Sequence, residues 1–283
     1  MGFFCIATTF VSGAIAERIS LKNYLLLVSV IGTLIYPVIA HWCWNAGSDS
    51  LPGGWLYQRG FVDLAVSTAV HSMGGWVALA ALKIIGPRHG RYDRPNMLSC
   101  YNVPMAILGA MILFVGWLGF NGGSTRELSS TTLIVLANTL VTGASSLVTA
   151  YLLQLIQRKT ISVENLITAF LGGLVASTAG SHLLTLPLSA LIGAGGAFLI
   201  LASIDLLQKY QIDDAVYVIP CHLVGGLWGA LSVAFLGDLN LLAIPLSRAD
   251  FILIQIQGIA AVGAWSFGVS TIVFRLLNKL SPL

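Results

Sequence analysis

The chain is 283 residues long, with 57% apolar residues and a mean hydropathy of +0.88. Only 9% of its residues are Asp, Glu, Lys or Arg, against roughly 25% in soluble domains, which is too few to cover the surface of a soluble protein. The net charge of +3 is spread over the chain and forms no polybasic patch, which argues against a nucleic-acid partner.

Nine apolar stretches are long enough to cross a bilayer, because a hydrocarbon core about 30 Å thick needs about 20 helical residues. In chain order these stretches are 2–17, 23–44, 61–86, 101–121, 129–157, 164–180, 185–208, 214–236 and 251–278. The first carries its basic residues after the apolar stretch, which is not the order of a signal peptide. We therefore expect an all-α integral membrane protein with about nine transmembrane helices, in which residues 1–283 form one membrane domain contacting lipid.

The basic residues alternate from loop to loop, as they do in membrane proteins whose cytoplasmic loops carry the excess of Lys and Arg. If the first loop is cytoplasmic, 11 basic residues lie inside and three outside. Those inside are Arg18, Lys22, Lys83, Arg88, Arg91, Arg94, Arg158, Lys159, Lys209, Arg275 and Lys279, and those outside are Arg59, Arg126 and Arg248. The pattern predicts a multi-pass protein of the cell inner (plasma) membrane, with its N-terminus outside and its C-terminus in the cytoplasm.

The third and eighth segments share a motif. One reads DLAVSTAVHSMGGW from Asp63 and the other DAVYVIPCHLVGGLW from Asp214, so each has Asp, seven residues, His, two residues and Gly-Gly. The copies are five segments apart and must cross the membrane in opposite directions, which is the inverted repeat of many transporters. His71 and His222 are thus expected to reach mid-membrane from opposite sides.

A titratable side chain in hydrocarbon is costly and usually functional. The double glycine after each histidine permits close helix approach, which would bring the imidazoles of His71 and His222 together. Two touching neutral imidazoles can share one proton and offer their other nitrogens to a small polar guest. The alternatives are core histidines bonded to backbone carbonyls and bis-histidine haem ligation, although nothing else in the chain suggests haem.

Asp63 and Asp214 stand at the starts of their segments, where a carboxylate can cap a helix. Capping is the preferred interpretation of Asp214, whereas for Asp63 a negative potential near the outer mouth is an equal alternative. The four cysteines, Cys5, Cys43, Cys100 and Cys221, occur singly, so we expect neither a metal site nor a disulfide framework. No nucleophile, base and orienting group converge in one stretch, which argues against an enzyme.

Together with YNVPMAILGAMILFVGWLGFNGGS, which lies between them, the two histidine motifs resemble those of the ammonium transporter family, Amt/Mep/Rh, over nearly the whole chain. The resemblance implies a homotrimer without a cofactor, in which each subunit conducts ammonium or ammonia, or methylammonium, through a narrow apolar pore. It also implies roles for particular side chains. These are ammonium recruitment by Trp44, Phe120 and Ser124, a gate of two stacked rings from Phe3 and Phe120, pore histidines His71 and His222, and supporting roles for Asp63, Trp117 and Thr178.

The physical chemistry of ammonium agrees with these roles. An aromatic face attracts the cation by about 0.5–2 kcal/mol. A bare ion in an apolar pore would face a desolvation penalty of order tens of kcal/mol, so that deprotonation is the easier course. The expected outcome is capture of ammonium outside and passage of ammonia along the imidazoles.

The chain also departs from the family pattern. The family has eleven helices, and this chain begins inside the third and stops at NKLSPL, which predicts an incomplete eleven-helix fold whose first repeat lacks helices and whose cytoplasmic tail is absent. The stretch STAGSHLL lacks the Pro, Cys and aromatic residue usual in the family's loop, and Thr178 is the position in it that matches.

A second function is open. The stretches HSMGGWVALAALKIIGPRHGR and CHLVGGLWGALSVAFLGDL resemble the branch of the family that is fused to kinase or cyclase output domains. In that case the chain would be an ammonium-sensing receptor domain. A PII-like regulator is a further partner that the resemblance implies.

Overall fold

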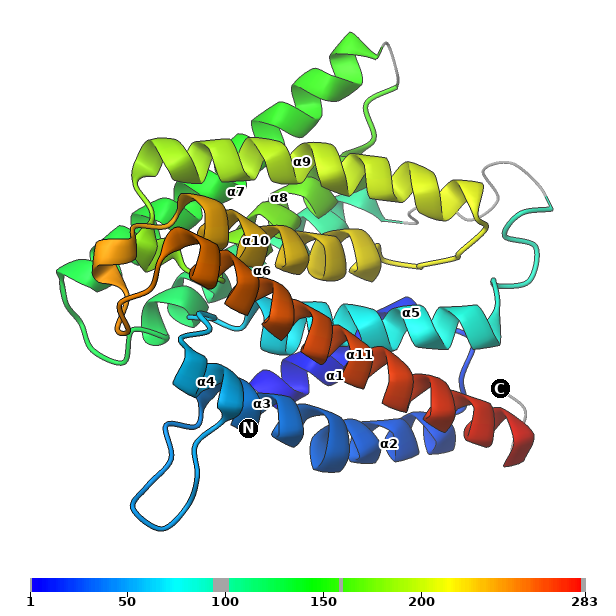
Figure 1. The fold of residues 1–283 in the computed structure, drawn as a ribbon. Coiled ribbons are helices and arrows are strands. Elements are labelled where there is room, and N and C mark those ends of the chain that lie inside the picture. Colours follow the sequence, from blue (N-terminus) through cyan, green and yellow to red (C-terminus); the bar gives the residue numbers. More distant parts are fainter. Residues whose placement is uncertain (1, 94–101, 158–159, 281–283) are drawn as a thin grey trace.

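The structure is a computed structural model that describes residues 2–93, 102–157 and 160–280, and within these ranges it contains helices and connecting loops but no β-strand (Figure 1). The α-helices are α1 (Gly2–Ala14), α2 (Leu21–Val30), α3 (Tyr36–Trp44), α4 (Trp55–Arg59), α5 (Met73–Ile85), α6 (Val103–Gly123), α7 (Ser130–Ile156), α8 (Val163–Ser177), α9 (Leu186–Lys209), α10 (Gly225–Leu236) and α11 (Arg248–Leu280). Three π-helical turns, η1 (Ile31–Ile35), η2 (Ser67–Ser72) and η4 (Ile219–Val224), and two 3₁₀ turns, η3 (Ser181–Leu183) and η5 (Leu239–Leu241), complete the elements. Arg94, Cys100, Arg158 and Lys159 lie outside the described residues.

Seven helical stretches of the described chain are long and apolar enough to cross a membrane. They are Leu21–Trp44, Ser67–Ile85, Val103–Gly123, Ser130–Ile156, Leu186–Lys209, Ile219–Leu236 and Arg248–Lys279. Two shorter apolar helices, Gly2–Ala14 and Val163–Ser177, match the two remaining expected segments. The prediction of an all-α integral membrane protein is confirmed.

Two of the predicted helix starts are wrong. The segments expected from 61 and 214 begin their helices at Ser67 and Ile219, because a residue one or two positions before each π turn lies in the left-handed backbone region. Val66 has φ 70° and Tyr217 has φ 55°, values that are uncommon for non-glycine residues and strained for a β-branched one. Each histidine therefore lies within the first turns of its helix rather than deep along it.

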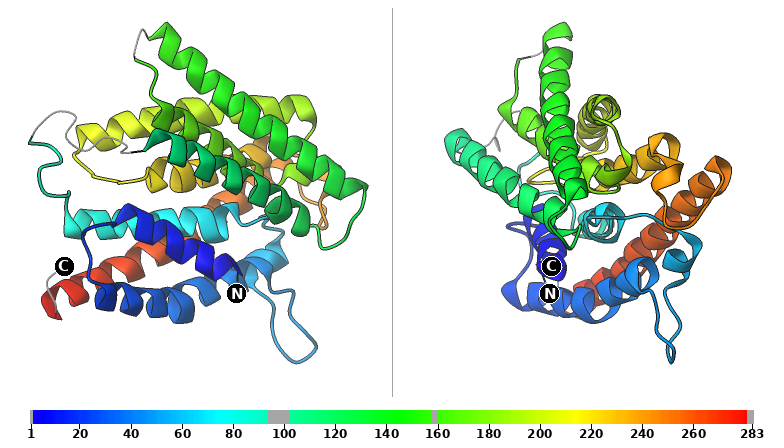
Figure 2. Two further views of the ribbon diagram at one scale, coloured as in Figure 1. Left: turned by 180° about the vertical axis from the view of Figure 1, so that it is seen from behind. Right: turned by 90° about the vertical axis from the view of Figure 1, so that its left-hand side faces the viewer.

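The helix α5 lies at the centre of the bundle, as the end-on view in Figure 2 shows. About 72% of the Ser67–Ile85 span is buried, against 11% of the Val103–Gly123 span. The long helix α11 packs along α5, and α7 packs against α8 and α9. The most protected part of the bundle is thus the span that carries His71, while α6 presents an apolar outer face, as expected for a helix exposed to lipid.

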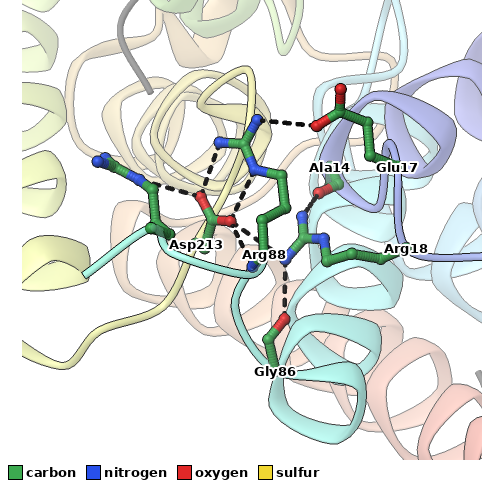
Figure 3. A network of polar contacts seen from close by, with 7 residues as sticks. Ala14, Glu17, Arg18, Gly86, Arg88 and Asp213 are labelled. Carbon is green, nitrogen blue, oxygen red and sulfur yellow. Dashed lines mark hydrogen bonds and ion pairs between the residues drawn. The ribbon is translucent and has the colours of Figure 1, made fainter. Parts of the chain in front are cut away.

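A buried carboxylate joins three chain segments at one end of the bundle (Figure 3). Asp213 accepts hydrogen bonds from the backbone N–H of Arg88 at 2.9 Å, from its Nε at 2.8 Å and from its Nη2 at 2.9 Å. Arg91 Nε donates at 3.3 Å, and Arg18 Nη1 lies 3.7 Å away while donating to the carbonyl of Gly86. Burial alone would raise the pKa of Asp213, but the bonds from Arg88 hold it below its usual value. The carboxylate thus ties the loops that follow α1 and α5 to the chain that enters η4.

Candidate functional site

The two histidines of the repeated motif meet. The Nδ1 atoms of His71 and His222 lie 3.2 Å apart, and the ring planes are within 8° of each other. A contact between two imidazole nitrogens at this distance is a hydrogen bond, so one Nδ1 carries the shared proton and the other accepts it. His71 Nε2 is buried without a hydrogen-bond partner in the described part of the chain, so this nitrogen is available to a guest.

The double glycines produce this contact, and they do so reciprocally. A Cβ on Gly75 would lie 2.8 Å from the backbone N of Leu223, the residue after His222. A Cβ on Gly226 would lie 2.5 Å from the carbonyl O of Ser67 and 3.2 Å from the N of Ser72, the residue after His71. Each copy's glycine therefore lies against the other copy's π turn, and any side chain there would separate the histidines.

Each motif aspartate caps the π turn that carries its histidine. Asp63 accepts from the backbone N–H groups of Thr68 at 3.1 Å and Ala69 at 2.9 Å. Asp214 accepts from the N–H of Ile219 at 2.6 Å, the position that corresponds to Thr68 in the repeat. These bonds satisfy donors that the start of a helix leaves free. Capping, expected for Asp214, is thus present in both copies.

A cavity of about 380 Å³, called the outer cavity because its side of the chain is expected to face outward, holds the side chains expected to recruit ammonium. Trp44, Phe120 and Ser124 line it together with Phe3. Trp44 Nε1 donates to the carbonyl of Asp63 at 3.0 Å, which fixes the indole at the cavity wall and links it to the capping residue. The Ser124 hydroxyl donates to the Phe120 carbonyl at 2.9 Å, so its oxygen keeps acceptor capacity for a guest.

The expected gate residues touch, but their arrangement differs from the expected stack. The rings of Phe3 and Phe120 lie 5.2 Å apart at 76°, edge to face. This is the geometry that the ring quadrupoles favour over a face-to-face sandwich. Phe120 of this pair also lies against His71, with ring centroids 5.7 Å apart.

A second cavity of about 320 Å³ lies beside His71 and is lined also by Phe120, Trp117 and Ile6. Phe120 faces both cavities. Trp117 lies nearly parallel to His71, with ring centroids 5.3 Å apart at 11°. The supporting role expected for Trp117 is consistent with this position against the imidazole.

Thr178 is not among the residues that line either cavity. Its hydroxyl donates to the Val175 carbonyl at 2.6 Å, and its own carbonyl accepts from Ala65 N at 2.8 Å. It anchors the extended chain before η2, and its expected place near the central pore stays a prediction.

Phe10 belongs to the site and was not foreseen from the sequence. Its ring lies 3.7 Å from the ring of His222 and 5.2 Å from that of His71, centroid to centroid. The helical spacing of Phe3, Ile6 and Phe10, which places all three on one face of a helix, is the signal that could have found it. Among the described residues no group of three or more His, Cys, Asp or Glu could hold a metal ion.

The chain is similar to known proteins over its whole length. The model of the Ammonium Transporter Family matches residues 1–283. A Synechocystis sp. protein is 38% identical over 99% of the chain, and the ammonium transporter Amt2 of Archaeoglobus fulgidus is 33% identical over 98% of it. The chain spans 53% and 63% of those two relatives.

A solved structure described as a sensor Amt protein is also similar. It superposes with a TM-score of 0.93 at 37% identity, covering 99% of this chain and 71% of that one. The two curated relatives are named as ammonium transporters and not as enzymes. On the match over its whole length, the chain belongs to the ammonium transporter family.

Proposed function

We propose that this chain carries ammonium, as ammonia, across the membrane along a path that passes the histidine pair. The observation that supports the proposal most strongly is the 3.2 Å contact between His71 and His222, which two halves of an inverted repeat create in the middle of the bundle. Family membership supports ammonium as the substrate.

Capture begins at the outer cavity. The face of Trp44 attracts a cation by about 0.5–2 kcal/mol, and the oxygen of Ser124 accepts one of the four hydrogen bonds that ammonium can donate. Arg126 also lines this cavity and opposes a cation, but its side chain is exposed and its field is screened by salt within about 10 Å. The net site is a weak cation receptor with an aromatic wall.

Deprotonation follows because the path beyond Phe3 and Phe120 is apolar. An unpaired ion in such surroundings costs far more than giving up its proton to water. Neutral ammonia can then donate to or accept from the imidazole nitrogens, of which His71 Nε2 has no partner within the described chain. The histidines thus supply hydrogen-bonding groups for ammonia within the apolar part of the path.

The membrane arrangement is part of the same proposal. The basic loops put the N-terminus outside and the C-terminus in the cytoplasm of a cell inner (plasma) membrane. The exposed apolar side chains of α6 and α7, such as Val115 and Leu133, are suited to contact lipid or the neighbouring subunits of a homotrimer.

A second candidate is an ammonium-sensing domain, supported by the similarity to the solved structure described as a sensor Amt protein. In that role the site would bind ammonium and bias a fused kinase or cyclase domain or another cytoplasmic partner, with little passage. The two candidates share the capture site and differ in whether the path beyond it conducts.

The experiment is an ammonium-pulse current on a solid-supported membrane that carries the full-length protein, compared with His71→Leu and His222→Leu. His41→Leu, whose histidine is exposed and bonded to Asn45, is the matched control. We expect a current in the wild type and in the control and none in the pair variants. Ammonium binding without current in the wild type would favour the sensor, and neither binding nor current would refute both candidates.

A further inference from the structure

We infer that the ring of Phe10 obstructs the path at the histidine pair and sets how fast ammonia passes. The inference rests on the proposed function, since it concerns the same path. Phe10 lies on the same face of α1 as Phe3 and Ile6, and it lines the second cavity, of about 320 Å³, together with His71.

The position of Phe10 along α1 makes it a second constriction. It is seven residues beyond Phe3, which at 1.5 Å per residue places it about 10 Å deeper. Phe3 meets Phe120 at the outer end of this stretch, and Phe10 meets His222 at the inner end. The contact between Phe3 and Phe120 thus precedes the histidines along the path, and the contact of Phe10 lies directly on His222.

The contact of Phe10 with His222 leaves no room for a guest between the rings. Their centroids are 3.7 Å apart and their planes are within 20°, which is van der Waals contact across the ring faces. An ammonia molecule that hydrogen-bonds along the imidazoles would have to pass the edge of this ring or displace it. Phe10 therefore raises the free-energy barrier to ammonia passage at the point where the imidazoles of His71 and His222 lower it.

The internal repeat offers its own comparison for this position. A Cβ on Gly74 would meet Phe10 Cδ2 at 3.0 Å and the carbonyl of Ala7 at 3.4 Å. In the second copy a Cβ on Gly225 would meet the carbonyl of Gly172 at 2.9 Å and Val175 Cβ at 3.4 Å.

Val175 on α8 thus occupies the place that Phe10 occupies on α1. Phe10 lies three positions after Ala7, which also contacts Gly74, and Val175 lies three positions after Gly172, which also contacts Gly225. The second copy packs against its double glycine with a valine. Close packing at the motif does not require an aromatic ring, and the ring of Phe10 is an addition on one side of the path.

The test compares ammonium-pulse currents of the full-length wild type with Phe10→Val, which copies the second repeat, and Phe10→Leu. Phe4→Leu is the matched control, because Phe4 lies on the same helix but packs against Gly32 and Tyr36, away from the histidines. Ammonium binding is followed in parallel by intrinsic tryptophan fluorescence. We expect the current to rise about three- to tenfold in both Phe10 variants, the factor that corresponds to one aromatic contact, and to stay at the wild-type level in Phe4→Leu.

An equal or smaller current in both Phe10 variants, with binding retained, would overturn the inference and leave the proposed function intact. A rise in Phe4→Leu as large as in the Phe10 variants would also overturn it, because the effect would then be general loosening of α1. Absence of both binding and current in the wild type and in every variant would refute the proposed function and this inference with it.

Discussion

Replacing Gly75 by alanine tests the packing that brings the two π turns together. The added Cβ would lie 2.5 Å from Leu223 Cβ and 2.8 Å from its backbone N. Ordinary contact begins at 3.4 Å. The difference between 3.4 Å and the 2.5 Å to Leu223 Cβ means that the two segments must separate by about 0.9 Å to admit the methyl group. Added to the 3.2 Å between the Nδ1 atoms of His71 and His222, such a shift exceeds hydrogen-bond distance.

The expected cost follows from overpacking of a core, which is about 1–3 kcal/mol. At roughly 2–4 °C per kcal/mol for a protein of this size, the melting temperature should fall by about 2–12 °C. The assay is fluorescence-monitored thermal unfolding of the full-length protein in detergent, followed by the ammonium-pulse current of the same variant. The current should fall with the loss of the imidazole contact.

Gly109→Ala is the matched control for this experiment. Gly109 lies on α6, and nothing is within 4 Å of the Cβ that alanine would add. Because alanine favours a helix over glycine by about 1 kcal/mol, this variant should melt at or slightly above the wild-type temperature with an unchanged current. Wild-type melting and current in Gly75→Ala would refute the argument that the double glycine sets the histidine contact.

Two further predictions concern carboxylates. Asp63→Ala leaves the buried N–H groups of Thr68 and Ala69 without their acceptor, at about 1–3 kcal/mol each, so thermal unfolding should occur at a clearly lower temperature, and an unchanged midpoint would count against the capping role. Asp213→Asn breaks a buried ion pair with Arg88 and should cost about 3–5 kcal/mol, which a denaturant titration measures. Because the bonds from Arg88 outweigh burial and lower the pKa of Asp213, its stabilisation is present above about pH 4 and is lost as the pH falls through that lowered value. The difference in melting temperature between wild type and Asp213→Asn should therefore stay constant from about pH 8 to pH 5 and shrink below about pH 4, and a difference that disappears near pH 6 would contradict this reasoning.

The sequence was sufficient for the features that repeat. Segment number followed from apolar length, and the contact of His71 with His222 followed from a duplicated motif on segments that cross in opposite directions. The double glycine predicted close approach, and the reciprocal contacts of Gly75 and Gly226 are its structural form. These are properties of spacing along one chain, which a sequence displays directly.

Features that depend on the backbone between elements were missed. The apolar run that contains Val66 looks continuous with the helix, yet its left-handed conformation starts the helix at Ser67, because the carboxylate of Asp63 binds the first free N–H groups. Hydropathy does not register such a break. The edge-to-face arrangement of Phe3 and Phe120 depends on ring rotation, which residue identity leaves open.

Phe10 was missed for a different reason. An aromatic residue in an apolar helix is usually a packing residue, and nothing in the local sequence distinguishes Phe10 from Phe4. The distinction appears when α1 is placed against η4, where the ring of Phe10 covers His222 and that of Phe4 does not. Comparison with Val175 on α8 then shows that the first copy has an aromatic ring where the second has a valine.

The central claim is that the inverted repeat joins His71 and His222 in one hydrogen bond, and ¹⁵N solid-state NMR of the histidine-labelled, full-length protein in lipid tests it most directly. We predict one protonated and one bare Nδ1 with a correlation between them, which disappears in His71→Leu and in His222→Leu. Two protonated or two bare Nδ1 atoms, with no correlation in the wild type, would contradict it.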